Sequence, residues 1–255
     1  MGSKEALFHT EVSSFTTIVR KGSALLSRCL PFPCDVSVVD DGLARAKELL
    51  RDNYGLAIIW NHSNMRDGPA IIVHIIFANS TLNSRRVLVP IADHQHGMIT
   101  RILAKTLDTD LVPIVTNETL ARGKAGARPV GHGKLRYAHE AISILKQGGV
   151  VVLAPQGTRG NYLADESGIE RSLRFLVKLT DREQFDRFAL LFVGISMKGI
   201  QDYNSENLRG LNHGVTYNLR VGRCVTKEEA IKLAGGNYGS WVCEELKPLV
   251  PEICQ

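Results

Sequence analysis

Residues 56–69 read LAIIWNHSNMRDGP, and this stretch decides the fold. The uncharged apolar run Leu56–Trp60 is typical of a buried strand with both faces covered. Polar residues follow, and Gly68-Pro69 then favours a helix start, with Asp67 or Gly68 as its N-cap and a helix running through Ile76. A strand, a polar loop and a helix form the repeating unit of an α/β protein. The many Ile and Val residues conflict with this helix, because propensity alone favours a strand there.

The same alternation extends along the chain in both directions. One helix is predicted over Leu43–Arg51. A second is predicted from the apolar face that Leu135, Ala138, Ile142 and Leu145 would form, and Gly148-Gly149 would end it. Further strands are predicted at Asp35–Val39, Arg86–Ile91, Leu111–Val115, Val150–Ala154, Phe188–Ile195 and Val215–Val221. We therefore predict an α/β fold with a central, mostly parallel sheet of about seven strands flanked by helices. Apolar and polar residues alternate in the last strand, which places it near an edge of the sheet.

The N-terminal region differs from this pattern. Apolar residues recur every three or four positions over residues 15–30, which predicts an amphipathic helix ended by Pro31 and Pro33. Basic residues occupy other positions, so the helix either packs on the core or lies on a membrane surface. We divide the chain into an N-terminal helical segment, residues 1–34, which contacts a membrane or an acyl chain in the second interpretation, and a single α/β domain, residues 35–255.

Composition excludes several classes of protein. Of the 255 residues, 44% are hydrophobic and 22% charged, which is typical of a folded soluble chain and excludes collagen, coiled coil and disorder. The longest apolar run, Phe188–Ile195, is far shorter than the roughly 20 residues of a membrane-spanning helix. The net charge of +5 is scattered, so we expect no nucleic-acid partner. No signal peptide is visible, and the five cysteines without a CxxC pair favour a reduced, cytoplasmic setting: Cys29, Cys34, Cys224, Cys243 and Cys254.

Two loops carry candidate chemistry, because ligands of α/β sheets gather beyond the carboxyl ends of strands. In the first loop, His62 leaves the strand end and Asp67 follows five residues later. A carboxylate that accepts a hydrogen bond from one imidazole nitrogen fixes the tautomer and leaves the other nitrogen free as a general base. The alternative for such a pair is a helix cap and a surface histidine.

The second loop, residues 155–160, reads PQGTRG and follows the strand Val150–Ala154. Its glycines let the backbone approach a ligand, and the Thr158 hydroxyl can donate a hydrogen bond. The planar guanidinium of Arg159 suits a phosphate or a carboxylate. Taken alone, the loop is equally consistent with an ordinary turn between a strand and a helix.

Together, the two loops resemble the motifs of the glycerolipid acyltransferase superfamily. The family's Asn-His-x4-Asp motif is matched at Asn61, His62 and Asp67. Its Glu-Gly-Thr-Arg motif is matched at Gly157, Thr158 and Arg159, with Gln156 in place of the glutamate. The resemblance covers roughly residues 36–221.

The resemblance implies an O-acyltransferase of phospholipid biosynthesis. His62 would deprotonate an acceptor hydroxyl while Asp67 orients the imidazole, and the donor would be acyl-CoA or acyl carrier protein. It implies no covalent acyl-enzyme, no metal and no cofactor. Residues Gln156–Arg159 would hold the acceptor, which is expected to be lysophospholipid-like. The protein would be cytoplasmic, with peripheral contact to the inner membrane face through residues 15–30.

Three departures from the family pattern concern the acceptor. Gln156 lacks the negative charge of glutamate, and Arg122 is the nearest candidate for the arginine of the second motif. The Pro-Val strand of the fourth motif is replaced by Phe192–Ile195. A different acceptor, such as a specialised-metabolite hydroxyl or amine, is therefore an alternative, as is a non-catalytic lipid-binding module. The basic, glycine-rich residues 121–134 either cover the acceptor or the carrier's phosphopantetheine, or form a solvated loop.

Two further hypotheses have weaker support in the sequence. A serine hydrolase would use Ser63 or Ser196, but Gly194–Lys198 breaks the GxSxG pattern at its last position. The His94-Gln95-His96 triplet lacks the spacing of metal ligands, so we expect a surface or structural role for it.

Overall fold

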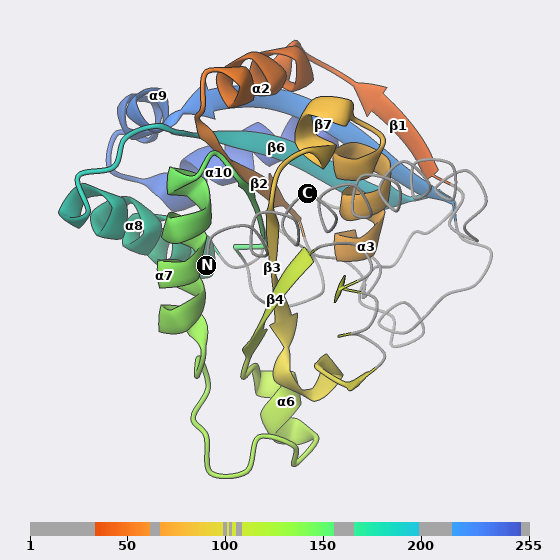
Figure 1. Ribbon diagram of the computed structural model, residues 1–255, viewed down its shortest axis with the longest axis vertical. Helices are drawn as coiled ribbons and strands as arrows, with labels where there is room; N and C mark the ends of the chain where they lie inside the picture. The colour runs from red at the N-terminus through yellow and green to blue at the C-terminus, as the bar shows by residue number, and fades with distance from the viewer. Residues whose placement is uncertain are drawn as a thin grey trace, which may run out of the picture.

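The structure, a computed structural model, describes residues 34–61, 67–98, 101, 104–105, 109–155, 166–198 and 216–250. The predicted N-terminal helix, residues 15–30, lies outside these ranges. Seven strands form one sheet in the order β1-β7-β6-β2-β5-β3-β4 (Figure 1). Their bounds are β1 Cys34–Val38, β2 Gly55–Trp60, β3 Val87–Ala92, β4 Thr109–Ile114, β5 Val150–Leu153, β6 Phe188–Met197 and β7 Tyr217–Thr226.

The direction of the strands confirms a mostly parallel α/β sheet. Strands β2 to β6 run the same way, since β2 pairs in parallel with β5 and β6, and β3 pairs in parallel with β4 and β5. Strand β7 is antiparallel to β6, and β1 lies at the edge, parallel to β7. The prediction that β7 lies near an edge is confirmed, and its reversed direction was not predicted.

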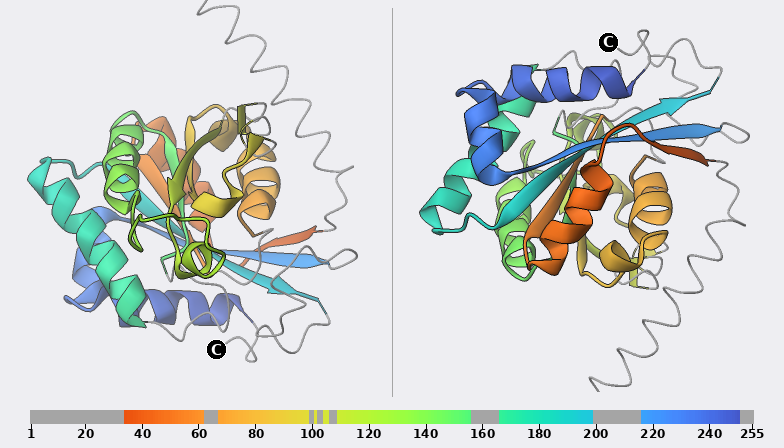
Figure 2. Two further views of the ribbon diagram at one scale, coloured as in Figure 1. Left: turned by 90° about the horizontal axis from the view of Figure 1, so that it is seen from below. Right: turned by 90° about the horizontal axis from the view of Figure 1, so that it is seen from above.

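Helices cover both faces of the sheet (Figure 2). One face carries α2 Gly42–Arg51, α3 Asp67–Ile71, the π-helix η1 Ile72–Phe77 and α4 Ser80–Asn83. The other carries α7 Lys134–Lys146, α8 Glu166–Arg182, α9 Lys227–Ala234 and α10 Tyr238–Leu246. Short elements are η2 Asp93–Gln95, α6 Asn117–Ala121 and η4 Lys247–Leu249. Strand β2 lies at the centre, with Leu56, Ile58 and Trp60 in one core and Ala57 and Ile59 in the other.

The conflict between helix and strand after Pro69 is resolved in favour of the helix. The chain is helical from Asp67 to Phe77, and its second part, η1, is a π-helix. Five of its six residues are buried: Ile72, Val73, Ile75, Ile76 and Phe77. Burial against the sheet therefore overrides the local preference of Ile and Val for strands. Among the described helices, none has the length and apolar character needed to cross a membrane.

One expectation about the core is wrong. Leu135 was predicted to lie on the buried face of α7, but it is 60% exposed. Helix α7 begins only at Lys134, so Leu135 belongs to its first turn, and burial begins with Tyr137 and Ala138. The predicted end of the helix is confirmed, since Gly148 adopts a positive φ of 68° directly after it.

Candidate active site

The two motif loops leave the sheet from neighbouring strands. Strands β2 and β5 are parallel partners, and their last pair is Ile59 opposite Leu153. Beyond that pair the chain continues to Asn61 in one strand and to Pro155 in the other. Both loops therefore start at the carboxyl edge of adjacent central strands, where α/β proteins bind their ligands.

The motif side chains themselves lie outside the described residues. This holds for His62 and for Gln156, Gly157, Thr158 and Arg159. The backbone of Asp67 is described, and Asp67 is the first residue of α3, so the helix begins one residue before the start expected with Asp67 as its N-cap. The structure therefore fixes where the loops begin, and the pairing of His62 with Asp67 stays a prediction.

Asn61, the first residue of the first motif, joins two strands. It is fully buried, and its Nδ2 donates a hydrogen bond of 2.8 Å to the carbonyl oxygen of Ile195. Its Oδ1 accepts one of 2.7 Å from the Ile195 amide. The amide side chain thus bonds to β6 beyond the last backbone pair, Trp60 opposite Val193. The bonds fix the chain one residue before His62, a role that the sequence did not reveal because the partner lies 134 residues away.

The end of β5 is held by two side chains from the helices above it. The Tyr137 hydroxyl of α7 donates a hydrogen bond of 3.0 Å to the Val152 carbonyl oxygen. Burial raises the pKa of Tyr137, so this group stays a neutral donor. The Ser172 hydroxyl of α8 donates a hydrogen bond of 3.1 Å to the carbonyl oxygen of Pro155, the first residue of the second loop. Both strand ends that carry motif loops are therefore fixed by polar side chains.

Strands β3 and β4 pair mainly with each other and only briefly with the central strands of the sheet. Strand β3 pairs with β5 only at Val87 and Leu88, but it pairs with β4 as far as Ala92 opposite Ile114. We call β3 and β4, with residues 93–98 and 115–133 at their carboxyl ends, the outer ribbon. Figure 1 shows it extending away from the other strands, with α6 at its end.

Polar contacts close the end of the outer ribbon. Nη1 and Nη2 of Arg128 donate to the Asp93 carboxylate, and His94 Nδ1 lies 3.0 Å from Thr119 Oγ1. These contacts support the predicted structural role for His94. Among the described residues, no group of three or more His, Cys, Asp or Glu side chains could hold a metal ion.

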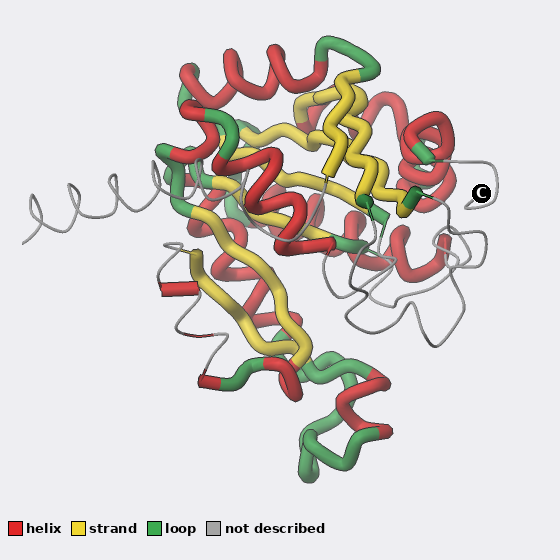
Figure 3. Tube along the Cα trace, turned by 90° about the vertical axis from the view of Figure 1, so that its right-hand side faces the viewer, coloured by secondary structure: helices red, strands yellow, loops and turns green. Residues whose placement is uncertain are grey.

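The basic, glycine-rich residues 121–134 extend beyond the carboxyl end of β4, at the end of the outer ribbon (Figure 3). The Gly131 amide donates to the Val115 carbonyl oxygen, and the Val115 amide donates to the His132 carbonyl oxygen, both at 2.9 Å. Ala125 is buried, whereas Arg122 and Lys124 are exposed. The loop thus combines a fixed backbone with exposed cations. Arg122 follows β4 at the edge of the sheet, and β3 separates that strand from β5.

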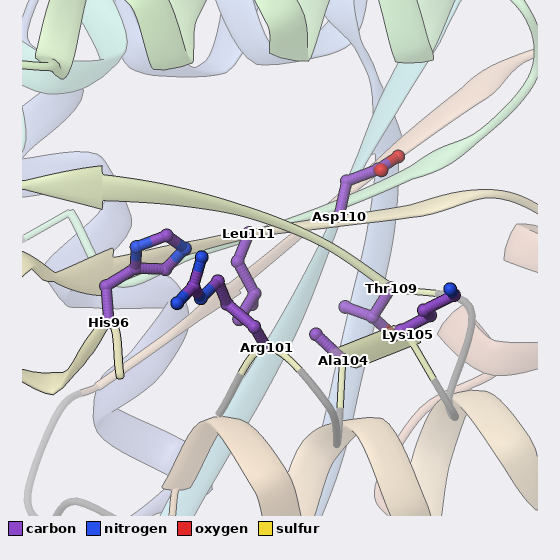
Figure 4. A pocket seen from close by; sticks show the side chains of 7 residues that line it. All are labelled: His96, Arg101, Ala104, Lys105, Thr109, Asp110 and Leu111. Carbon is purple, nitrogen blue, oxygen red and sulfur yellow. The ribbon is translucent and has the colours of Figure 1, made fainter. Parts of the chain in front are cut away.

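A hollow of about 330 Å³ lies beside β4, between the first residues of that strand and His96, which follows η2 after β3. Figure 4 shows that Asp110 points away from His96 and Arg101, and its carboxylate pairs with Arg86 at 2.6 Å. Asn61 is not among the described residues that line this hollow. Its lining is His96, Arg101, Ala104, Lys105, Thr109, Asp110 and Leu111.

Three described nucleophilic side chains, those of Ser196, Cys34 and Cys224, are poor candidates for catalysis. Ser196 is buried within the continuous strand β6 rather than on a strand-to-helix elbow. Burial raises the pKa values of the Cys34 and Cys224 thiols to about 12, so both are protonated at neutral pH. Ser63, the other serine of the hydrolase hypothesis, lies outside the described residues.

The departure at the fourth motif has a packing explanation. A Cβ atom on Gly194 would lie 2.3 Å from the carbonyl oxygen of Leu249 in η4. Only glycine lets β6 and η4 approach this closely. This part of the motif region therefore contacts the C-terminal end of the described chain.

Comparison with protein-family models and with curated proteins found no match to this chain. The resemblance to the glycerolipid acyltransferases rests on the motif residues quoted above.

Proposed function

We propose that this protein is an acyltransferase that moves an acyl group from an acyl thioester, acyl-CoA or acyl carrier protein, to an acceptor hydroxyl. His62 is the general base and Asp67 orients its imidazole. Gln156, Gly157, Thr158 and Arg159 bind the acceptor. The reaction needs no metal or cofactor of the protein.

The proposed step is a direct transfer. His62 takes the proton of the acceptor hydroxyl while that oxygen attacks the thioester carbonyl carbon. A carbon–oxygen bond forms, the carbon–sulfur bond breaks, and the imidazolium returns its proton to the leaving thiolate. Asp67 keeps its charge throughout and stabilises the imidazolium. General-base assistance of this kind contributes about 10²–10⁴-fold to the rate.

The pairing of β2 with β5 is the observation that carries the proposal. Two motifs about 90 residues apart in the sequence leave the same edge of adjacent parallel strands, with Ile59 opposite Leu153. A base on one loop and an acceptor-binding arginine on the other can then serve the same substrate. Asn61 and Ser172 fix the starting point of each loop, which favours a preorganised site.

The acceptor we favour is a lysophospholipid-like alcohol, reached from the cytoplasmic face of the membrane with residues 15–30 in peripheral contact. A second candidate is an acceptor without a glycerophosphate group. Gln156 lacks the charge of the family's glutamate, and Arg122 follows β4 at the edge of the sheet. Both features favour an acceptor site that differs from the family pattern, next to a His62 and Asp67 pair that matches it.

Release of free thiol from acyl-CoA and acyl carrier protein donors, measured across a panel of acceptors, tests the proposal. The full chain should release thiol only with a suitable acceptor, and His62→Ala should lower kcat at least 100-fold. Ser63→Ala is the matched control, since it alters the neighbouring residue and should leave kcat within threefold. Loss of activity in Ser63→Ala together with a trapped acyl adduct would show a hydrolase, and ligand binding without any transfer would show a lipid-binding module.

A further inference from the structure

Helix α8 presents a line of cationic and aromatic side chains to solvent. Most of its apolar residues, among them Ile169, Leu173 and Leu176, are buried against the core. Arg171, Phe175, Lys178 and Arg182 are exposed and follow one another at intervals of four, three and four residues. This spacing places them along one side of the helix, over about 16 Å. We call these four residues the α8 ridge.

Among the described side chains, no carboxylate forms an ion pair with a cation of the α8 ridge. Four carboxylates with described side chains lie on the helix or just after it, and each pairs with a lysine or arginine outside the ridge. Glu170 pairs with Arg174, Glu183 with Lys146, and both Asp181 and Asp186 with Lys227. Within the described ranges, neither Arg171 nor Lys178 has an ion-pair partner. Arg182 contributes to lowering the pKa of Glu183, but Lys146 is the hydrogen-bonded partner and the larger cause.

Phe175 adds an apolar anchor between the cations. It is 44% exposed on a helix whose other large apolar residues are buried. A single aromatic ring flanked by cations is typical of a binding surface for a protein, where aromatic and arginine side chains contribute most of the affinity.

The α8 ridge lies next to the candidate active site. Ser172, the neighbour of Arg171, donates its hydroxyl to the carbonyl oxygen of Pro155, where the second motif loop begins. A protein bound along α8 would therefore have one end close to the carboxyl edge of β5. An acyl chain carried by that protein would be delivered to the edge where His62 is expected.

We infer that the α8 ridge docks a partner protein through an acidic helix, and that this partner is the carrier-protein form of the acyl donor. The inference rests on the proposed function for the identity of the partner, and on charge complementarity for the docking itself. Three cations spaced over three helical turns match an acidic helix of similar length. The free coenzyme needs no such surface, because a small ligand cannot contact the whole ridge.

The geometry of α8 favours a protein over a lipid surface. A helix that lies on a bilayer inserts its apolar face, and the apolar face of α8 is occupied by the core. Phe175 is then the only large apolar side chain that the described part of α8 could insert. Such a contact gives little membrane affinity, but it suffices as an anchor in a protein interface.

Fluorescence anisotropy of a labelled holo acyl carrier protein, titrated with the full-length protein, tests the inference without requiring catalysis. The double variant R171E/K178E should weaken binding at least tenfold, and F175A should weaken it at least threefold. The matched control K47E/R51E makes the same change of charge on α2, on the opposite face of the sheet, and should leave the dissociation constant within twofold. Binding of the unmodified protein should fall as salt rises from 50 to 500 mM.

Catalysis separates the failure of this inference from the failure of the proposed function. R171E/K178E should raise KM for the acyl carrier protein donor about tenfold and leave kcat/KM for acyl-CoA within twofold. Equal effects of the α8 and α2 variants on anisotropy, or no binding at all, would overturn the inference whatever the activity. If R171E/K178E lost binding to vesicles that contain anionic lipid but kept its binding to the carrier protein, the α8 ridge would contact a membrane instead. Carrier binding that depends on the α8 ridge, without any acyl transfer, would leave the docking surface standing and overturn the proposed function.

Discussion

The central strands and the outer ribbon are stabilised in different ways. At the centre, β2, β5 and β6 are buried on both faces, and buried side chains such as Asn61 and Tyr137 fix their carboxyl ends. At the end of the outer ribbon, the contact between Arg128 and Asp93 is partly exposed, and the cations of residues 121–134 face solvent. The motif with the proposed base starts at the rigid centre, whereas the outer ribbon carries Arg122, the weakest match to the family. The loop with the proposed base therefore starts from the more buried region, and the candidate for the second-motif arginine lies in the more solvated one.

Glycine substitutions should give the largest difference between the two regions. Gly194→Ala places a Cβ 2.3 Å from the Leu249 carbonyl oxygen, in a region where neither backbone can move freely. We expect it to lower the free energy of unfolding by about 3 kcal/mol or more. Gly123→Ala in the outer ribbon meets open space, and its cost of about 1 kcal/mol comes from its φ of +63°. Urea unfolding measures both, and equal losses would contradict the comparison.

Asn61 and Arg128 allow a second comparison, because each side chain makes two hydrogen bonds to one partner. Asn61→Ala leaves the amide and carbonyl of Ile195 without these partners inside the core, and we expect a loss of about 2–3 kcal/mol. Arg128→Gln removes an ion pair whose arginine side chain is 42% exposed, so we expect a loss below about 1 kcal/mol. A loss in Arg128→Gln as large as that in Asn61→Ala would show that the outer ribbon is not the weaker region.

The sequence predicted the strands of the sheet better than its helices. Continuous apolar runs such as Leu56–Trp60 and Phe188–Ile195 indicate buried strands whatever their order in the sheet. Helices α8, α9 and α10 were missed, although a signal for α9 is present. The Thr226 side chain accepts a hydrogen bond from the Glu229 amide, and the Glu229 side chain accepts one from the Thr226 amide. These bonds form a capping box, and the two residues have the Thr-x-x-Glu spacing that marks this motif in a sequence.

The candidate site was predictable only as two separate loops. Sequence patterns identify the residues on each loop, but the neighbouring positions of β2 and β5 depend on strand order, which no local pattern contains. The same is true of the contacts that fix the loops. Asn61 and Ile195 are 134 residues apart, and Ser172 lies 17 residues from Pro155 across residues 156–165, which lie outside the described ranges. Such contacts arise from packing, so they could not be read from composition or periodicity.

Tyr137 gives the smallest effect expected among the central residues and a test of pH dependence. Tyr137→Phe removes the hydrogen bond to the Val152 carbonyl oxygen at the centre, and we expect a loss of about 1 kcal/mol at pH 7. Burial raises the pKa of Tyr137 above its ordinary value of 10.0, so the folded protein keeps a proton that the unfolded chain loses at high pH. The contribution of this hydroxyl to stability is therefore fully present below about pH 10 and declines as the pH rises above it.

The difference in unfolding free energy between the unmodified protein and Tyr137→Phe should accordingly stay constant from pH 7 to 9.5 and shrink from pH 10 to 11. The remaining tyrosines are common to both proteins, so their titration cancels in the difference. A difference that stays constant or grows up to pH 11 would mean that Tyr137 ionises as readily in the folded state as in the unfolded state. The end of β5 would then be open to water, and the distinction between a buried centre and a solvated outer ribbon would fail at the strand that carries the second motif loop.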